Sequence, residues 1–272
     1  MPKVARSRRL VMKPDLEALR SLPLLRSFPD DLLAALNETA DLVRFAAAEE
    51  VFKAGERLSQ LHYLLSGSIG ATRLSLGEED DLVDVLLPVQ PLCLPAVLLD
   101  LPAPIGAYTL TAGHLITLSA SRLREVIAGD AGLARPFLDY ALRQAHEQTL
   151  ENSNLKLRSS AQRLAGFMLG LIEDPEEKPA RFVLPFKKEL VAVRIGCTQE
   201  HLSRAFATLR EIGVETWQGA VLVHDVPALR AFSYTSGRST DQSAAWIVKR
   251  YAALGREADP APPMIDLAGS EP

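Results

Sequence analysis

The sequence contains little cysteine and no long apolar run. Its 2 cysteines, Cys93 and Cys197, are far apart in the chain, so they form neither a disulfide framework nor a CxxC metal pair. No stretch of about 18 apolar residues suggests a membrane span, and the basic start of the chain lacks the apolar core of a signal peptide. We therefore expect a soluble protein of the reducing cytoplasm.

The sequence also lacks an overall basic charge and the common motifs of catalysis. Its net charge is −4 and its pI is near 5.8, so any contact with nucleic acid must come from a local basic patch. No GxGxxG, P-loop, HExxH or GxSxG sequence occurs, and the carboxylates gather only in solvated runs such as residues 78–81. These features do not suggest an enzyme.

The N-terminal half has a helical segment followed by many short apolar runs. Residues 1–13 are predicted to be a flexible basic tail, and the leucines between residues 14 and 42 recur at helical spacing. Glycines then separate short runs of the length of strands, at 42–45, 50–52, 61–65, 69–74, 82–87, 108–110 and 115–118. This texture predicts a small antiparallel sandwich or jelly roll.

A long helix is predicted from about Pro136 to Leu157, with an N-cap for the preceding short helix at Ser119 or Ser121. Pro136 is tolerated there if it falls in the first turn. A helix of about 20 residues spans about 30 Å, which is more than one small β domain can cover. A second copy of the same helix is the natural partner, although packing within one chain is the alternative.

Residues 187–223 predict two helices joined by a tight turn and followed by a β-hairpin. Gly196 suits the turn and Thr198 is a good N-cap for the second helix. The apolar positions are expected inside the domain: Leu190, Val191, Val193, Ile195, Leu202, Ala205, Phe206 and Leu209. The hairpin GVETWQGAVLV has the character of a wing. Before this segment, Ser159 or Ser160 caps another predicted helix.

The exposed face of the second predicted helix carries residue types that bind DNA. Gln199, Glu200, His201, Ser203 and Arg204 remain outside near its N-terminus, the region from which a recognition helix reads bases. An arginine can present its guanidinium to guanine, a glutamate can accept from cytosine, and a serine is an adaptable contact. A helical hairpin with a solvated charged face is the alternative.

The charge of the same region differs in sign from that of the chain. Between residues 156 and 210 there are 10 basic and 6 acidic side chains, so the segment carries 10 − 6 = +4. Lys187 and Lys188 belong to this excess, at the start of the first helix of the pair. A local positive charge supplies the phosphate attraction on which nonspecific DNA affinity depends.

On these residues the chain resembles the CRP/FNR family of bacterial transcription regulators. The likeness is most specific in IGCTQEHLSRAF and the wing. It extends to the order β domain, long helix, winged helix over about residues 14–232, and the branch it most resembles is FtrB-like, through LPVQPLCLPAVLLDLP, NLKLRSSAQRLAGFML and LPFKKELVAV. The resemblance implies an α+β chain with a cyclic-nucleotide-binding-like β jelly roll, acting as a homodimer with RNA polymerase. It also implies that Glu200, Ser203 and Arg204 read a two-fold, TTGA-like site.

The resemblance divides the chain into five parts. Residues 1–13 are the tail, 14–129 the sensor β-roll, 130–158 the dimerisation helix, 159–232 the winged helix-turn-helix and 233–272 a partly disordered extension. Within the extension, residues 244–254 are expected to form a short helix. A sensor module that acts only through protein partners, without binding DNA, remains an alternative.

The predicted sensor domain departs from the family's cyclic AMP site. Asp100 is the only side chain with a formal charge between residues 85 and 121, so nothing in that segment neutralises a cyclic phosphate. An iron–sulfur cluster is not expected either, because residues 1–92 contain no cysteine. A packed core under a proline-rich loop is one reading of the segment. The other is a pocket for a hydrophobic ligand or haem, with Cys93, His62 and His114 as candidate ligands.

Overall fold

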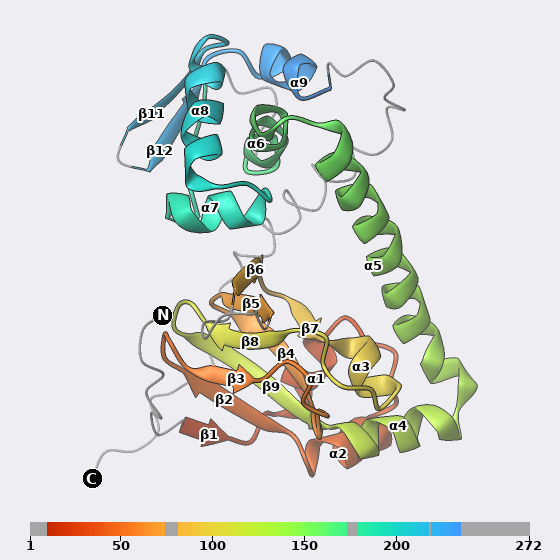
Figure 1. Ribbon diagram of the computed structural model, residues 1–272. Coiled ribbons are helices and arrows are strands. Elements are labelled where there is room, and N and C mark those ends of the chain that lie inside the picture. Colours follow the sequence, from red (N-terminus) through yellow and green to blue (C-terminus); the bar gives the residue numbers. More distant parts are fainter. Residues whose placement is uncertain (1–9, 74–80, 173–178, 186, 218, 235–272) are drawn as a thin grey trace. The chain divides into compact units, whose positions relative to one another are not determined.

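The computed structural model describes residues 10–73, 81–172, 179–185, 187–217 and 219–234 (Figure 1). The chain divides into two compact units, residues 1–149 and 150–272, and helix α5 (Ala131–Leu157) crosses the boundary between them. Of the helices described, none combines the length and the hydropathy needed to cross a membrane. The predicted helix at 244–254 and the predicted disorder beyond it lie outside the described residues.

The first unit contains two antiparallel sheets, as the spacing of the short apolar runs predicts. The larger sheet has the order β1 (Leu10–Met12), β2 (Asp41–Phe45), β9 (Gly113–Ser119), β4 (Gln60–Ser66) and β7 (Gln90–Leu92). The smaller has the order β3 (Glu50–Phe52), β8 (Gly106–Thr109), β5 (Ile69–Arg73) and β6 (Asp81–Leu86). The predicted β domain of short antiparallel strands is therefore confirmed.

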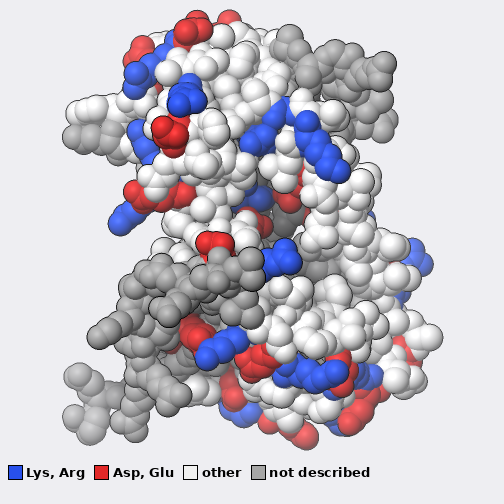
Figure 2. Space-filling model, in the orientation of Figure 1, with Lys and Arg blue, Asp and Glu red and all other residues white. Residues whose placement is uncertain are grey.

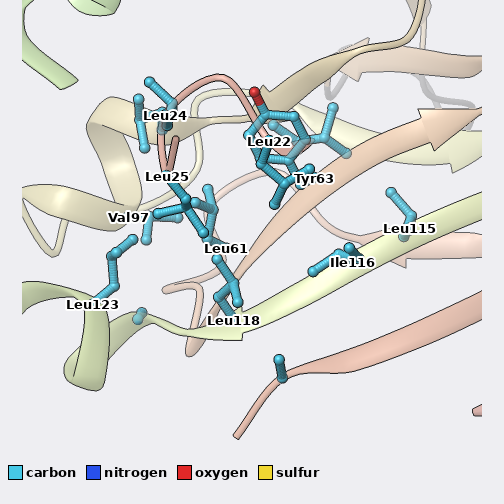
Figure 3. Packing of buried hydrophobic residues seen from close by; sticks show 14 of the residues in the cluster. Leu22, Leu24, Leu25, Leu61, Tyr63, Val97, Leu115, Ile116, Leu118 and Leu123 are labelled. Carbon is cyan, nitrogen blue, oxygen red and sulfur yellow. The ribbon is translucent and has the colours of Figure 1, made fainter. Parts of the chain in front are cut away.

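Four short helices cover one face of the larger sheet: α1 (Leu16–Ser21), α2 (Asp30–Asn37), α3 (Leu94–Leu98) and α4 (Ala120–Gly129). Because side chains alternate along a strand, Leu61 of β4 and Leu118 of β9 point to this face, where Val97 and Leu123 lie close to them (Figure 3). All four side chains are buried, and burial of one such side chain contributes about 1.5–3 kcal/mol.

The structure corrects two expectations about the N-terminal half. Residues 10–12 belong to β1, which pairs with β2, so the predicted tail 1–13 is wrong from Leu10 onward; residues 1–9 lie outside the described part. Lys13 donates hydrogen bonds from Nζ to the carbonyls of Glu38 (3.0 Å) and Ala40 (2.7 Å). The proline-rich segment also contains a helix, α3. Pro95 is its second residue, where the missing N–H leaves no bond unmade.

Helix α5 begins five residues earlier than predicted, at Ala131. Pro136 is therefore its sixth residue, beyond the first turn, and the helix lacks the hydrogen bond that an N–H at this position would give to the carbonyl of Gly132. The predicted end at Leu157 and the predicted N-cap of α4 at Ser119 are confirmed. Phe137 anchors the first turns of α5, because its ring lies edge-on to that of Phe28, 6.1 Å between centroids.

The second unit is a helical domain with a three-stranded sheet. Its helices are α6 (Ser160–Leu169), α7 (Lys188–Arg194), α8 (Gln199–Arg210) and α9 (Val226–Tyr234). The strand order is β10 (Ala180–Val183), β12 (Ala220–Val223) and β11 (Val214–Trp217). The predicted wing is β11 and β12, whereas β10 and α9 have no counterpart in the prediction.

Candidate nucleic-acid interface

Helix α8 has a capped start and one strongly apolar face. Thr198 is its N-cap and its Oγ1 accepts a hydrogen bond from the backbone N–H of His201 at 3.3 Å. Four side chains at helical spacing are buried against the rest of the domain: Leu202, Ala205, Phe206 and Leu209. The buried face fixes the rotation of α8, so the opposite face is presented to solvent.

The exposed face of α8 gathers the residues that the sequence singled out. Gln199, Glu200, His201, Ser203 and Arg204 are all exposed. The guanidinium of Arg204 lies 3.9 Å from the carboxylate of Glu200, one turn earlier, and 71% of the Arg204 side chain is exposed. Such an exposed pair contributes little to stability, so both side chains are available to a ligand. The structure places these predicted residues together on one edge.

The turn between α7 and α8 has the geometry that its glycine predicts. Gly196 has φ +67°, the left-handed conformation that favours glycine. The N–H of Gly196 donates to the carbonyl of Val193 at 2.9 Å, and the N–H of Cys197 donates to the carbonyl of Ala192 at 2.9 Å. These two bonds form a Schellman motif, which ends α7 and starts α8 two residues later.

The two lysines at the start of α7 occupy different environments. Lys187 is the N-cap position of α7 and is exposed, without a side-chain hydrogen bond to the helix end. The ammonium group of Lys188 lies over the ring of Phe206, 5.1 Å from its centroid. This cation–π contact holds the charge of Lys188 beside α8. The first helix of the pair therefore carries two positive charges at its start.

The outer face of the wing sheet is partly apolar. Val183, Ala220 and Trp217 are cross-strand partners in one row, and all three are exposed, Trp217 by 74%. Arg181, Leu222 and Glu215 form the next row on the same face. The opposite face is buried through Val214, Val221 and Val223. On the face of the molecule in Figure 2, Lys and Arg alternate with Asp and Glu, so neither sign forms a continuous field there.

Comparison with known proteins identifies the helix-turn-helix domain and the fold. Residues 162–232 match the model of the Crp-like helix-turn-helix domain. A Ruegeria pomeroyi protein provisionally described as cyclic-nucleotide-binding superposes with a TM-score of 0.58 at 23% identity, over 82% of this chain and 100% of that one. The CRP-family transcriptional regulator TTHB099 of Thermus thermophilus superposes with a TM-score of 0.54 at 19% identity, over 72% and 99%. The chain has the fold of a CRP-family transcription regulator.

A third structure has the same CRP-family fold. The regulator CLP of Xanthomonas campestris, described as responsive to c-di-GMP, superposes with a TM-score of 0.55 at 15% identity, over 72% of this chain and 100% of that one. A search of curated protein sequences finds no match. The matched domain therefore defines the helix-turn-helix in this chain, and the solved structures define its fold.

The candidate haem ligands are spread over the β domain of this CRP-family fold. His62 on β4 pairs in register with Leu92 of β7, next to Cys93, whereas His114 on β9 pairs with Ser66 at the far end of β4. Four residues along a strand span about 13 Å. The ring of His62 lies 5.5 Å from that of Phe52 on the other sheet, so it points between the sheets. Cys93 therefore follows directly after the residue that pairs with His62, and His114 is remote from both.

Burial affects the ionisation of the candidate ligands. It raises the pKa of the Cys93 thiol to about 11, so the thiolate, which is the form that binds metals, is disfavoured at neutral pH. Burial, with a smaller effect of Arg44, lowers the pKa of His114, whose Nδ1 lies 3.1 Å from Ser66 Oγ. Among the described residues no cluster of three or more His, Cys, Asp or Glu side chains suits a metal ion.

One polar side chain of the second unit, Arg163, makes several hydrogen bonds that the sequence did not predict. Arg163 of α6 donates hydrogen bonds to backbone carbonyls of both neighbouring segments, at 2.7 Å to Ile195 and 2.7 Å to Arg158. The sequence offers one local signal in this region, since Ser159 and Gln162 have the spacing of a capping box, which the structure confirms. The contacts of Arg163 are long-range, and no local pattern reveals them.

Proposed function

We propose that the protein is a homodimeric, sequence-specific transcription regulator that reads DNA with α8. The observation that carries the proposal is the exposed edge of Glu200, Ser203 and Arg204 at the capped N-terminal end of a helix whose opposite face is buried. Recognition helices enter the major groove with these first turns. Likeness to the CRP/FNR family supports RNA polymerase as the protein partner.

Each side chain on this edge has a role in the proposal. Arg204 presents two N–H groups to O6 and N7 of a guanine, and Glu200 accepts from the N4 amine of a cytosine. Ser203 donates to the carbonyl of Gln199 at 3.0 Å, which leaves its oxygen free to accept. Likeness to the CRP/FNR family, and to its FtrB-like branch, supports a two-fold site with TTGA-like half-sites.

The surrounding residues position the protein on the DNA backbone. Lys187 and Lys188 stand at the start of α7, and Thr198 lies at the N-terminus of α8, where backbone N–H groups favour an anion. Gln199 and His201 are exposed on the same turn of α8 and act as secondary readers. The phosphate contacts of Lys187, Lys188 and Thr198 fix register and orientation rather than sequence.

The dimer is proposed to form along α5. Leu138 and Leu142 are 54% and 60% exposed, and together with Ala145 they follow the spacing of a helical seam. Exposed leucines in a row on a long helix are costly unless a partner covers them. A second copy of α5 covers them in the proposed dimer, which also supplies the two α8 helices that a two-fold site needs.

The proposed effector is not a cyclic nucleotide. Residues 85–121 carry no cationic side chain, and α3 is buried through Leu94, Ala96 and Val97. The fold brings Arg57 and Arg124 to this segment, but both lie at the C-terminal end of α3. Arg124 donates to the carbonyl of Val97 at 2.7 Å, and Arg57 donates to that of Asp100. An unpaired phosphate in this environment would be costly to bury.

The replacement Arg204→Ala tests the function. It should relax the preference at one base position by roughly 1–3 kcal/mol while the dimer persists. Arg210→Ala, at the other end of α8, is the matched control and should weaken binding evenly across sequences or not at all. The measurement is the binding of both variants to a panel of single-base substitutions. An unchanged base preference in Arg204→Ala would contradict the assignment.

A further inference from the structure

One arginine joins three parts of the DNA-binding unit. The guanidinium of Arg163 donates from Nη1 to the carbonyl of Arg158, just beyond the end of α5, at 2.7 Å. It donates more weakly to that of Leu155, in the last turn of α5, at 3.5 Å. It donates from Nε to the carbonyl of Ile195 at 2.7 Å and from Nη2 to that of Gly196 at 3.0 Å, both in the turn before α8. We call these five residues the Arg163 junction.

The two carbonyls that Arg163 binds at the turn, those of Ile195 and Gly196, take no part in the hydrogen bonds that end α7. The Schellman motif uses the carbonyls of Ala192 and Val193. Those of Ile195 and Gly196 come next in the chain, at the negative end of the α7 dipole, and a cation is favoured there. The end of α5 presents its carbonyls to the same guanidinium. One positive charge therefore stabilises two helix ends at once.

Two further contacts connect the same segments. The Cδ2 methyl of Leu155 lies where it would be 2.6 Å from a Cβ atom at residue 196, so the absence of a side chain at Gly196 makes room for it. The guanidinium of Arg194 on α7 lies 3.2 Å from the carboxylate of Glu151 on α5. The packing of Leu155 and the ion pair of Arg194 thus connect α5 to the same segment as the Arg163 junction does.

The corner between α5 and α6 is short and fully bonded. It consists of Arg158 and Ser159. Arg163 holds the carbonyl of Arg158, and Gln162 accepts from the N–H of Ser159 at 3.0 Å while its own N–H donates to Ser159 Oγ at 3.2 Å. A hinge needs backbone groups that are free to change direction, and this corner offers few.

We infer that Arg163 is a positioning residue that makes the last two turns of α5 and the turn before α8 one rigid body. Any change in the direction of α8 then moves the end of α5 with it. The inference rests on the proposed function, because it assigns the side chain that holds α8 at a fixed angle for DNA.

The first experiment measures how strongly binding depends on half-site separation. One inserted base pair moves a half-site by about 3.4 Å and turns it by about 35°. Full-length wild type should lose about tenfold in affinity for such a site, because α8 is held rigidly. In Arg163→Met we expect the best site to bind about tenfold more weakly and the loss on insertion to shrink below about threefold.

Two variants separate geometry from charge. Arg163→Lys keeps the charge but lacks the fork of N–H groups, so it should behave like Arg163→Met. Arg26→Met removes an exposed arginine from the first unit and should match the wild type. An unchanged separation profile in Arg163→Met would overturn the inference. If Arg163→Met does not fold, Leu155→Ala, whose side chain is half exposed, should reduce the separation dependence in the same direction.

The second experiment works without DNA. Amide hydrogen exchange of the full-length protein should show residues 155–163 and 195–198 exchanging faster together in Arg163→Met, with residues 205–210 of α8 unchanged. Acceleration in only one of the two segments would contradict a shared rigid body. If the wild type binds no DNA sequence, the proposed function fails, and the exchange result still decides whether Arg163 joins the two segments.

Discussion

Two glycines with left-handed backbone conformations differ in how closely other atoms pack against them. Gly219 in the wing turn has φ +87° and nothing within 4 Å of an added Cβ, whereas Gly196 has φ +67° and Leu155 at 2.6 Å. The sequence predicts the turn at Gly196, since glycine is the residue for such angles. It does not reveal that Leu155, more than forty residues earlier in the chain, packs onto that glycine.

Replacing both glycines by alanine separates backbone strain from packing. Gly219→Ala carries only the strain of a left-handed alanine, about 1–2 kcal/mol. Gly196→Ala also displaces the Leu155 methyl group, so we expect it to cost about 1 kcal/mol more. Leu155→Ala in the Gly196→Ala background should remove that difference. Urea unfolding followed by circular dichroism measures the series, and equal costs for the two glycine variants would argue against the contact.

The buried thiol of Cys93 makes the stability of the first unit depend on pH. Its pKa is raised to about 11 by burial, so the folded state holds the proton more tightly than the unfolded chain does. This stability is complete below about pH 9 and is lost as the pH rises towards about 11. We expect the first unit to lose about 2 kcal/mol over this range, and Cys93→Ala to lose distinctly less. Urea unfolding between pH 8 and pH 11 tests this, and parallel losses would contradict it.

At the scale of elements, α5 combines anchoring at one end with exposure along its length. Leu133 and Phe137 are buried in the first unit, while Leu138 and Leu142 are exposed. Residues four apart lie on the same side of a helix. The seam that we propose for the dimer therefore runs beside the buried anchor and not through it.

The glutamate variants of α5 test this seam. Leu142→Glu puts a charge in the proposed interface and should shift the protein from dimer to monomer at micromolar concentration. Arg143→Glu puts the same charge on the neighbouring residue, about 100° further around the helix, and should leave the dimer intact. Analytical ultracentrifugation reads out both. A dimeric Leu142→Glu, or a monomeric wild type, would contradict the proposed seam.

Elements with strong local patterns were predictable, and those that depend on distant partners were not. The capped amphipathic helix α8 and the glycine-punctuated strands were identified because composition and periodicity specify them. Strands β1 and β10 have three and four residues, and their pairing with β2 and β12 brings together segments about 30 to 40 residues apart. Short strands stabilised by remote partners leave little trace in local sequence.

The sequence predicted the exposed residues of the candidate site, but not the side chains that hold α8 in position. Thr198 and the exposed edge of α8 follow from capping and periodicity, and the structure places them as expected. The cation–π contact of Lys188 with Phe206 and the bonds of Arg163 depend on the tertiary approach of α6, α7 and α8. Side chains that hold a site in position are set by packing between elements, which periodicity does not specify.

At the scale of the whole molecule, a chain of net charge −4 must bind a polyanion through a small region. In the proposed function, the basic excess of residues 156–210 provides phosphate attraction and the edge of α8 provides discrimination. Neither alone gives sequence-specific binding. A dimer supplies two such regions, one for each half of a two-fold site.

Selection of bound sites from random duplex DNA by the full-length protein tests this account most directly. We predict a two-fold motif with TTGA-like half-sites whose centres are about one helical turn, roughly 34 Å, apart. Arg204→Ala, selected in parallel, should yield the same symmetry with one base position relaxed. Recovery of no shared motif, or of a single asymmetric site that the variant selects equally well, would contradict DNA recognition by the edge of α8.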